Sequence, residues 1–275
     1  MILDGRQIAT EILEQIKLEV QKLPFKPVFC DVLVGDDSAS TQYVKMKAKA
    51  AEKVGIKFHS ANFPSTITTE ELIQEIYKLN KIQNICGLIV QLPLPEHINK
   101  QSALNAIDPK IDADSTGEVN TNLFYNNQTY VGFPTALAVM ELLNRAKADY
   151  KNHNFLVLGQ GQLVGKPVSF LLSQLGAKVN IARSKTENTA ELMRQADVII
   201  SAVGKPKLVS GDKVKTNVII IDAGTSESDG SVVGDVDFET VKEKAAYISP
   251  VPGGVGPLTV AMLLKNVLTI AKSKI

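Results

Sequence analysis

The chain has 275 residues, of which 44% are hydrophobic, and it carries 30 basic and 29 acidic residues. This hydrophobic content is enough for a real core and excludes wholesale disorder, while the length suggests one large domain or two moderate ones. The net charge of +1 gives no indication of nucleic acid or an anionic membrane as the partner, so we expect neither.

The sequence predicts a soluble, cytoplasmic protein. Its first residues, MILDGRQIATEIL, have the pattern of an amphipathic helix and lack the basic start and apolar core of a signal peptide. No apolar run reaches the ~18 residues that a membrane-spanning helix needs. Cys30 and Cys86 lie in the apolar runs PVFCDVLV and NICGLIV, which favours buried thiols in a reducing compartment.

The first third of the chain alternates between helical patterns and short apolar runs. We expect helix and strand in strict alternation at residues 8–20, 27–35, 38–54, 55–63, 68–80 and 87–95. The helix in TTEELIQEIYKLN begins with a threonine that has a glutamate three positions on, which is a capping signature. The resulting βαβαβ order predicts a parallel sheet with helices on both faces.

Residues 105–133 break this rhythm, and a second series follows them. They are rich in Asp, Asn and Gly with little periodicity, which predicts a long loop or linker. Pro134 then begins a long helix, since proline is favoured in a first turn. Further strands and helices are expected at residues 155–158, 164–175, 178–182, 188–196, 198–203 and 218–222. The final segment, LTVAMLLKNVLTIAKSK, is apolar on most faces and must be buried.

Three glycines follow the strand at 155–158 and open the next helix, at Gly159, Gly161 and Gly165. This context is typical of a dinucleotide-binding loop, in which the backbone approaches a pyrophosphate and the helix N-terminus supplies free N–H groups. An ordinary tight turn between strand and helix is the alternative.

The end of the following strand favours NADP over NAD. An NAD site usually has an acidic residue there to accept from the ribose hydroxyls. This chain has Arg183, Ser184 and Lys185 instead, and two cations with a hydroxyl suit a 2′-phosphate. A solvated basic turn is the alternative, and NAD use stays open.

Three further segments, SAVGKP (201–206), IDAGTS (221–226) and SPVPGGVGPLT (249–259), each follow a predicted strand. In open α/β sheets ligands bind at this carboxyl edge. A glycine pair between prolines makes a rigid loop that lets a ligand approach the backbone. Taken alone, the last segment would be interpreted as a turn.

Polar side chains in the first half suggest acid–base chemistry. Tyr43 and Lys47 are four residues apart on a predicted helix and so share a face. Gln91 interrupts an apolar run, and a buried amide must find partners. Asp112 and Asp114 lie in the long loop. Taken singly, the lysine is consistent with surface charge and the aspartates with a solvated turn.

The order of motifs resembles the bifunctional methylenetetrahydrofolate dehydrogenase/cyclohydrolase family from the start of the chain to its last helix. The segments VGDDSASTQYVKMKAKAAEKVGI, GLIVQLPLP, VGKP, AVGKP, GDVDF and PVPGGVGPLT all occur in the family's order. VQLPLP and PGGVGP are far more specific than the glycine loop. A shikimate-type or amino-acid dehydrogenase would share the glycine loop but gives no reason for these two motifs.

The resemblance implies a catalytic role for four residues. Lys47 matches the family's catalytic lysine, a proton donor and acceptor at the reacting folate nitrogen and water. Gln91 matches the glutamine that orients this lysine, and Tyr43 the tyrosine beside the pterin and aminobenzoyl portion. Asp114 matches the aspartate that anchors the pterin. No metal is implied.

The resemblance also implies two sets of contact residues. Substrate contacts are expected at Tyr43, Gln91, Leu92, Pro93, Asp114, Pro252, Gly253, Gly254 and Pro257. Cofactor contacts are expected at Gly159, Gln160, Gly161, Val164, Gly165, Lys166, Pro167, Arg183, Ser184, Val203, Gly204, Gly224, Thr225, Gly256 and Thr259.

The chain departs from the family pattern at several positions. The family's Arg-Ser after the first glycine is Gln160-Gly161, which removes a cation from the 2′-phosphate, and Arg183 stands where the family has a histidine. The family's Asp-Gly pair is Asp114-Ser115 here. The family's Pro-Cys-Thr-Pro before the long helix reads Phe-Pro-Thr-Ala from residue 133. The four chemical residues are retained.

We therefore expect an α/β protein of two domains, each a mostly parallel sheet flanked by helices. Residues 1–120 would form the folate-binding catalytic domain and residues 121–275 a Rossmann-type domain, whose last helix (258–275) returns to the first. The implied activity is NADP-dependent oxidation of 5,10-methylenetetrahydrofolate, then hydrolysis to 10-formyltetrahydrofolate, by a homodimer formed through the cofactor domain. The alternatives are a dehydrogenase-only or NAD-preferring homologue, and a non-catalytic folate- or nucleotide-binding paralogue.

Overall fold

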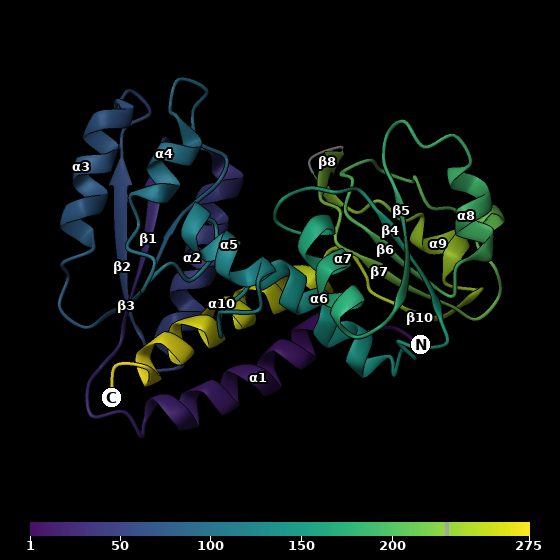
Figure 1. Ribbon diagram of the computed structural model, residues 1–275, viewed down its shortest axis with the longest axis horizontal. Coiled ribbons are helices and arrows are strands. Elements are labelled where there is room, and N and C mark those ends of the chain that lie inside the picture. The colour runs from purple at the N-terminus through teal and green to yellow at the C-terminus, as the bar shows by residue number, and fades with distance from the viewer. Residues whose placement is uncertain (229–230) are drawn as a thin grey trace. The chain divides into compact units, whose positions relative to one another are not determined.

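The computed structural model describes residues 1–228 and 231–275 (Figure 1). The chain divides into two compact units. Unit 1 comprises Met1–Ala9 and Thr135–Thr259, and unit 2 comprises Thr10–Pro134 and Val260–Ile275. Residue 120, where we expected the domain boundary, lies inside unit 2. Both units are α/β, as the sequence predicts.

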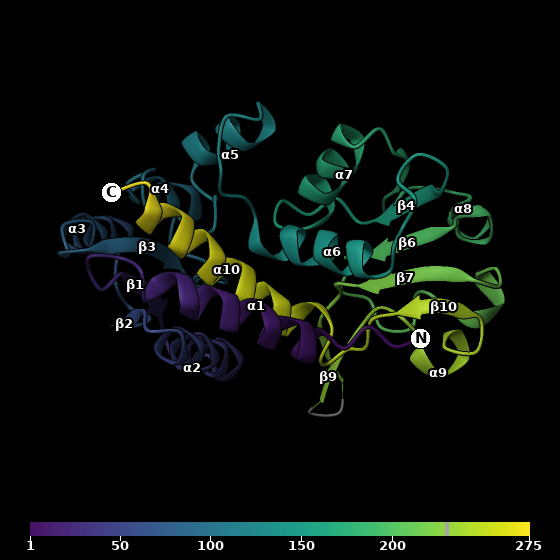
Figure 2. The ribbon, with the colours of Figure 1, turned by 90° about the horizontal axis from the view of Figure 1, so that it is seen from below.

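Unit 2 contains a three-stranded parallel sheet in the order β2-β1-β3. Its strands are β1 (Val28–Val34), β2 (Lys57–Phe63) and β3 (Ile85–Val90). Helix α2 (Ser38–Lys53) connects β1 to β2, and α3 (Thr69–Leu79) connects β2 to β3. The two connections run in opposite directions across the sheet, so right-handed crossovers place α2 and α3 on opposite faces, as Figures 1 and 2 show. Every residue of β1 is therefore buried.

The predicted helix start at Thr68 is confirmed. Thr68 accepts a hydrogen bond from the Glu71 backbone N–H over 3.2 Å, and the Glu71 side chain accepts from the Thr68 N–H over 2.9 Å. This reciprocal capping box satisfies two N–H groups that the first turn leaves free. Cys30 and Cys86 are both buried, as expected from their apolar runs.

Residues 105–133 are more ordered than their composition predicts. They follow a short helix, α4 (Lys100–Asn105), and contain α5 (Glu118–Tyr125). The expectation of a continuous loop is therefore wrong. Helix α5 has no capping side-chain hydrogen bond at Gly117, and it is held by aromatic packing of Phe124 on Phe133, whose ring centroids are 5.0 Å apart.

The unit 2 portion of helix α10 (Val255–Lys272) is a core element. The Asn266 amide donates hydrogen bonds to the carbonyls of Ala113 and Gly132, over 2.8 and 2.7 Å. Contrary to our expectation, an 18-residue window of α10 is apolar enough to span a bilayer, with a mean hydropathy of 1.3. Because 67% of that window is buried, we interpret α10 as a core helix.

Unit 1 contains a five-stranded parallel sheet in the order β10-β7-β6-β4-β5. Its strands are β4 (Asn154–Leu158), β5 (Lys178–Ala182), β6 (Val198–Ser201), β7 (Val218–Asp222) and β10 (Ala245–Ile248). Helices α6 (Pro134–Arg145) and α7 (Gly165–Gln174) cover one face, and α8 (Thr189–Gln195) and α9 (Phe238–Val241) the other (Figures 1 and 2).

Three small elements of unit 1 are not apparent from the sequence. They are the 3-10 turn η1 (Gly211–Lys213) and an antiparallel pair, β8 (Ser226–Ser228) with β9 (Ser231–Val233). Strand β6 ends at Ser201, two residues before its predicted end, because its ladder with β4 and β7 stops there. Val203 and Gly204 therefore lie in the loop that follows the strand.

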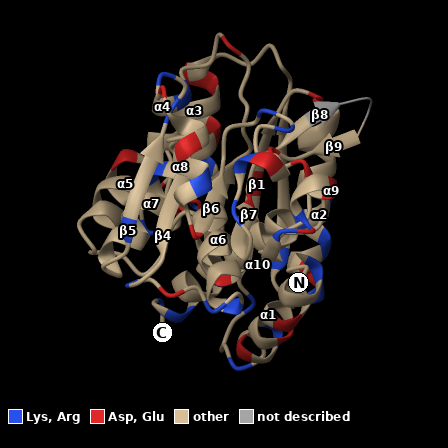
Figure 3. Ribbon diagram, turned by 90° about the vertical axis from the view of Figure 1, so that its right-hand side faces the viewer, with Lys and Arg blue, Asp and Glu red and all other residues tan. Residues whose placement is uncertain are grey.

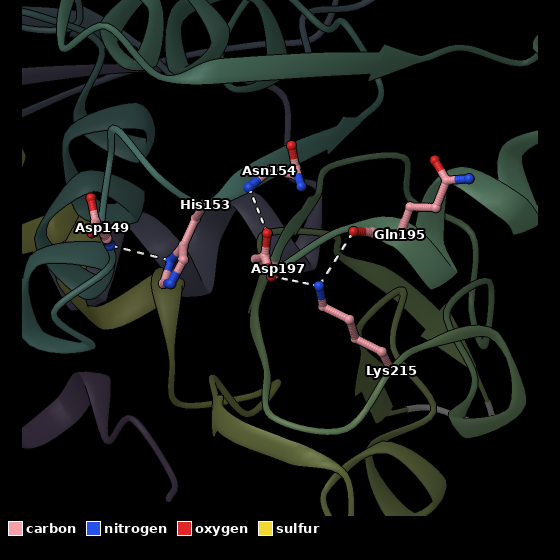
Figure 4. A network of polar contacts seen from close by, with 6 residues as sticks. All are labelled: Asp149, His153, Asn154, Gln195, Asp197 and Lys215. Atoms are coloured by element: carbon pink, nitrogen blue, oxygen red, sulfur yellow. Dashed lines mark hydrogen bonds and ion pairs between the residues drawn. The ribbon is translucent and has the colours of Figure 1, made fainter.

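A polar network lies at the amino ends of β4 and β6 (Figure 4). Asp197 accepts hydrogen bonds from the Asn154 backbone N–H and the Lys215 ammonium, over 2.7 and 2.5 Å. Burial opposes these bonds, but together they lower the pKa of Asp197. His153 accepts from the Asp149 N–H nearby. Because ligands of parallel sheets bind at the carboxyl edge, we interpret this network as structural.

Candidate active site

Helix α2 places Lys47 in the interior of unit 2. Asp37 caps the helix by accepting from the Ser40 N–H over 2.8 Å. Lys47 falls on the buried face of α2 together with Val44 and Ala51, and it is 1% exposed. On the same helix Lys45 is exposed, which separates a surface lysine from a buried one.

Among the described residues, the Lys47 ammonium contacts an amide, a carboxyl group and an aromatic ring. It donates a hydrogen bond to Gln91 Oε1 over 2.7 Å, and it lies 2.7 Å from Asp31 Oδ2. The same nitrogen lies 5.1 Å from the centroid of the Tyr43 ring, within the range of a cation–π contact. The structure thus brings Gln91 together with Tyr43 and Lys47, which the sequence had placed on one helix face.

Asp31 is a member of this cluster that sequence reasoning missed. It lies in the middle of β1 and is 0% exposed. Burial raises its pKa, against the attraction of the Lys47 charge. The available signal was a carboxylate inside the apolar run VFCDVLV, since a fully buried strand rarely carries an unpaired charge.

The loop after α4 carries Asp114 toward the same cluster. Asp112 anchors the loop, because its carboxylate accepts from the backbone N–H groups of Thr116 and Gly117, over 3.3 and 2.9 Å. It is 1% exposed, so the alternative of a solvated turn is wrong for Asp112. Burial raises the pKa of Asp114 to about 7; the Lys47 charge lowers it, and the charges of Asp112 and Asp31 raise it.

Ser115, next to Asp114, occupies a backbone conformation that favours glycine. Its φ is 57°, in the left-handed region, and the residue is 0% exposed. Its hydroxyl has no hydrogen-bond partner among the described residues. The family pattern has a glycine here, and this geometry gives the physical reason for that preference.

Gln91 directly precedes a segment that lines a mainly apolar hollow. It follows β3 directly, and its side-chain amide donates to the Leu92 carbonyl over 2.5 Å. The residues after it surround a hollow of about 530 Å³, lined by Leu92, Pro93, Leu94, Pro95, Glu96, Ile98 and Lys100. The expected substrate contacts Leu92 and Pro93 therefore line a space of small-molecule size.

In unit 1 the glycine loop joins β4 to α7 as predicted. Gly159 has a φ of 91°, and a Cβ there would lie 2.4 Å from the Ala202 carbonyl oxygen. A Cβ on Gly165 would lie 2.2 Å from the Gly159 carbonyl oxygen. At Gly161, no heavy atom of the described chain lies within 4 Å of an added Cβ. Gly159 and Gly165 are thus required by packing, and Gly161 leaves backbone open to a ligand.

The other end of this loop forms a basic corner. A hollow of about 570 Å³ is lined by Gly159, Gln160, Lys166, Arg183 and Ser184. The Gln160 side chain turns back into the protein, where it donates to Ser169 Oγ over 3.0 Å. Val164 is the N-cap of α7 and Pro167 lies in its first turn, and neither lines this hollow.

Two buried aspartates hold the expected cofactor loops at the carboxyl edge of the sheet. Asp235 accepts from Ser201 Oγ and from the N–H groups of Val203 and Lys205, over 2.6, 2.8 and 2.7 Å. Asp222 accepts from the Gly224 N–H over 3.0 Å, and burial raises its pKa to about 6.

Neither aspartate was picked out from the sequence, although both lie in quoted motifs. A Cβ on Gly224 would lie 2.2 Å from the Asp235 carboxylate, so this glycine is needed for close packing. Gly204 has a φ of 74°. Thr225 directly follows Gly224 and is exposed.

The segment before α10 is a tight loop, as the glycine pair predicts. Gly253 has a φ of 114°, and a Cβ on Gly254 would lie 2.6 Å from the Pro250 carbonyl oxygen. A Cβ on Gly256 would meet no heavy atom of the described residues within 4 Å. Pro252 precedes the glycines, while Pro257 and Thr259 lie in the first turns of α10.

Comparison with known proteins covers nearly the whole chain. The model of the tetrahydrofolate dehydrogenase/cyclohydrolase catalytic domain matches residues 3–114, and the model of the NAD(P)-binding domain of the same family matches residues 134–275. The bifunctional protein FolD of Nautilia profundicola is 44% identical over 276 residues, which cover 99% of this chain and 97% of that protein.

Solved structures agree with these matches. The bifunctional enzyme FolD, methylenetetrahydrofolate dehydrogenase/cyclohydrolase, from Campylobacter jejuni has a TM-score of 0.96 and 38% identity, and covers 100% of this chain and 99% of that one. The Trypanosoma brucei N5,N10-methylenetetrahydrofolate dehydrogenase-cyclohydrolase, complexed with NADP cofactor and inhibitor, has a TM-score of 0.94 and 37% identity, with coverage of 100% and 98%. The chain belongs to the tetrahydrofolate dehydrogenase/cyclohydrolase family.

Proposed function

We propose that the chain oxidises 5,10-methylenetetrahydrofolate to 5,10-methenyltetrahydrofolate with NADP and hydrolyses the product to 10-formyltetrahydrofolate. The observation that carries the proposal is the buried Lys47, whose ammonium is held by the Gln91 amide oxygen over 2.7 Å. A lysine removed from solvent beside an orienting amide is a suitable group to move protons at a bound substrate. Family membership supplies the substrate class.

We assign the folate and catalytic role to unit 2 and the cofactor role to unit 1. Asp114, which the resemblance pairs with the pterin, shares an electrostatic environment with Lys47. The hollow beyond Gln91 offers apolar walls from Leu92 and Pro93 for the aminobenzoyl portion. In this assignment Tyr43, 5.1 Å from the Lys47 ammonium, supplies an aromatic surface next to the reacting atoms.

The residues of unit 1 suit NADP. Gly161 and Gly256 leave backbone exposed where a side chain would otherwise stand, which suits close approach of a pyrophosphate and a nicotinamide. Arg183, Ser184 and Lys166 line one hollow, and two cations with a hydroxyl suit a 2′-phosphate. When bound, NADP supplies the acceptor for the hydride. The main contribution of the protein to this step is therefore to position the folate and the cofactor.

Hydrolysis, unlike oxidation, needs a protein side chain that accepts and donates protons. The attacking water must lose a proton while its oxygen bonds to the methenyl carbon. In the proposal Lys47 takes that proton and later returns one to the folate nitrogen as the carbon–nitrogen bond breaks. Gln91 fixes the lysine nitrogen during both transfers, since its own amide is held at the Leu92 carbonyl.

The test is an assay of the purified chain with 5,10-methylenetetrahydrofolate and either NADP or NAD, followed by absorbance through oxidation and hydrolysis. Lys47→Met should lower the rate of hydrolysis by about 10²–10⁴-fold and leave oxidation largely intact. Lys45→Met removes an exposed lysine of the same helix and is the matched control. Accumulation of methenyltetrahydrofolate by the unaltered chain would support the dehydrogenase-only alternative. Absence of turnover with both cofactors would support the non-catalytic one.

Assembly and location are also part of the proposal. We expect a cytoplasmic homodimer formed through the cofactor unit, without nucleic-acid or membrane partners. Strand β5 is an edge strand whose Asn180 and Ile181 are exposed, and unpaired edges of this kind favour association. Basic and acidic residues are interspersed in Figure 3, which gives no support to a polyanionic partner. Sedimentation equilibrium of the purified chain tests the dimer.

A further inference from the structure

A carboxylate in the central strand of unit 2 depends on the lysine for its charge partner. Asp31 lies between Ser60 of β2 and Ile89 of β3 in the sheet register, and is 0% exposed. Its Oδ2 lies 2.7 Å from the Lys47 ammonium. Its Oδ1 has no hydrogen-bond partner among the described residues. An ionised carboxylate in such a place is costly unless an opposite charge compensates it.

The contacts of Lys47 differ in kind. Gln91 offers a neutral amide oxygen, and Tyr43 offers the face of a ring at 5.1 Å. Asp31 is the acidic contact, with a carboxyl oxygen at hydrogen-bond distance. An opposite charge within this distance favours the ionised form of both partners. Asp31 therefore interacts with the positive charge of Lys47, whereas Gln91 orients the Lys47 side chain through a hydrogen bond.

We propose that Asp31 is a positioning residue for the hydrolysis step, holding the Lys47 nitrogen beside Gln91 and favouring its ammonium form. The inference rests on the proposed function. As the oxygen of water bonds to the methenyl carbon, one O–H bond breaks and one N–H bond forms on Lys47. The positive charge thus moves from the folate to the lysine, opposite Asp31. The carboxylate stabilises that charge as it forms.

Other titratable groups share this environment. From β1, Cys30 lies next to Asp31, and burial and that neighbouring charge raise its pKa to about 12, so it stays a neutral thiol. From the loop, Asp114 interacts electrostatically with Lys47, Asp112 and Asp31, and its pKa is raised to about 7, mainly by burial and in part by the Asp31 charge. Loss of the Asp31 charge thus acts on Lys47 directly and favours ionisation of Asp114.

The test is the pH dependence of methenyltetrahydrofolate hydrolysis by Asp31→Asn, which removes the charge at nearly constant volume. We expect the pH midpoint of kcat to move down by about one unit or more, since a buried ammonium without its counter-charge loses its proton more readily. KM and the rate of oxidation should change little. An unchanged midpoint would overturn the proposal, because a purely structural role changes stability and leaves the midpoint in place.

Matched variants separate this effect from general damage. Glu14→Gln removes the acidic partner of Lys53 in an exposed pair of unit 2, with both side chains 53% exposed, and should leave the profile unchanged. Asp31→Glu keeps the charge and should keep the midpoint of the unaltered chain while lowering kcat. If Asp31→Asn fails to fold, Asp31→Glu serves as the test instead. An Asp31→Glu variant with an unaltered kcat would then overturn the proposal.

A double variant tests whether Asp31 works through the lysine. Adding Asp31→Asn to Lys47→Met should produce no further loss of hydrolysis, because the group that Asp31 positions is already gone. An equal loss in both backgrounds contradicts the proposal. Failure of the unaltered chain to hydrolyse methenyltetrahydrofolate would instead overturn the proposed function on which this inference rests.

Discussion

Replacement of Ser115 by glycine should stabilise the protein. A non-glycine residue in the left-handed region costs about 1–2 kcal/mol, and Ser115 has a φ of 57°. Glycine loses more conformational freedom than serine on folding, which offsets about 0.5–1 kcal/mol of the stabilisation. The hydroxyl is buried without a partner in the described structure, a loss of about 1–3 kcal/mol. Together these effects predict a gain of roughly 2 kcal/mol in the free energy of unfolding.

Urea denaturation followed by circular dichroism measures this gain, with Ser115→Ala as the matched control. Alanine removes the hydroxyl but keeps the Cβ in the left-handed region, so Ser115→Ala should provide the hydroxyl contribution alone. Glycine should then be more stable than alanine by the backbone contribution. A glycine variant less stable than the alanine variant would refute the backbone reasoning, and an alanine variant less stable than serine would refute the reasoning on the hydroxyl.

Three other predictions concern the two units separately. Arg183→Ala should raise KM for NADP about tenfold or more and KM for NAD much less, because a charge-assisted bond to phosphate contributes about 1.5–3 kcal/mol. Arg194→Ala removes an exposed arginine of unit 1 outside the hollow and is its control. Equal losses for both cofactors would contradict the assignment. Asp235→Asn should destabilise unit 1 by about 1.5–3 kcal/mol and raise KM for the cofactor, since one amide oxygen cannot accept the three hydrogen bonds that the carboxylate accepts. Urea denaturation measures the loss of stability, and cofactor titration measures the change in KM. Asp114 has a pKa raised to about 7 in the folded chain, so folding takes up a proton and the free energy of unfolding falls as pH rises from about 4 to 7. Asp114→Asn should flatten this fall when urea denaturation is measured at several pH values. An unchanged slope would contradict the raised pKa.

Local patterns predicted most of the fold. The capping box at Thr68, the proline at the start of α6 and the apolar runs of β1, β3 and β7 each determine structure over a few residues, so the sequence reveals them. Helix α5 was missed because its stability is not local. It lacks a side-chain cap at Gly117, and the packing of Phe124 on Phe133 holds it.

Only some residues of the candidate site were predicted from the sequence. Spacing suggested that Tyr43 and Lys47 share a helix face, and the motifs singled out Gln91 and Asp114. Spacing also predicted that Lys45 and Lys49 point away from Lys47 to solvent, and both are exposed. It could not show that Lys47 itself is buried. Burial depends on how α2 packs on the sheet, which is a tertiary property.

Asp31 shows why a motif alone does not define this site. A buried ion pair is weak evidence for stability, since well-packed apolar residues of similar volume often stabilise a fold as much or more. An apolar residue would also continue the pattern of β1, whose other six residues are buried and uncharged. The carboxylate is nevertheless placed 2.7 Å from Lys47, the lysine to which we assign the proton transfers. Its position is therefore better explained by control of the Lys47 charge than by stabilisation of the sheet.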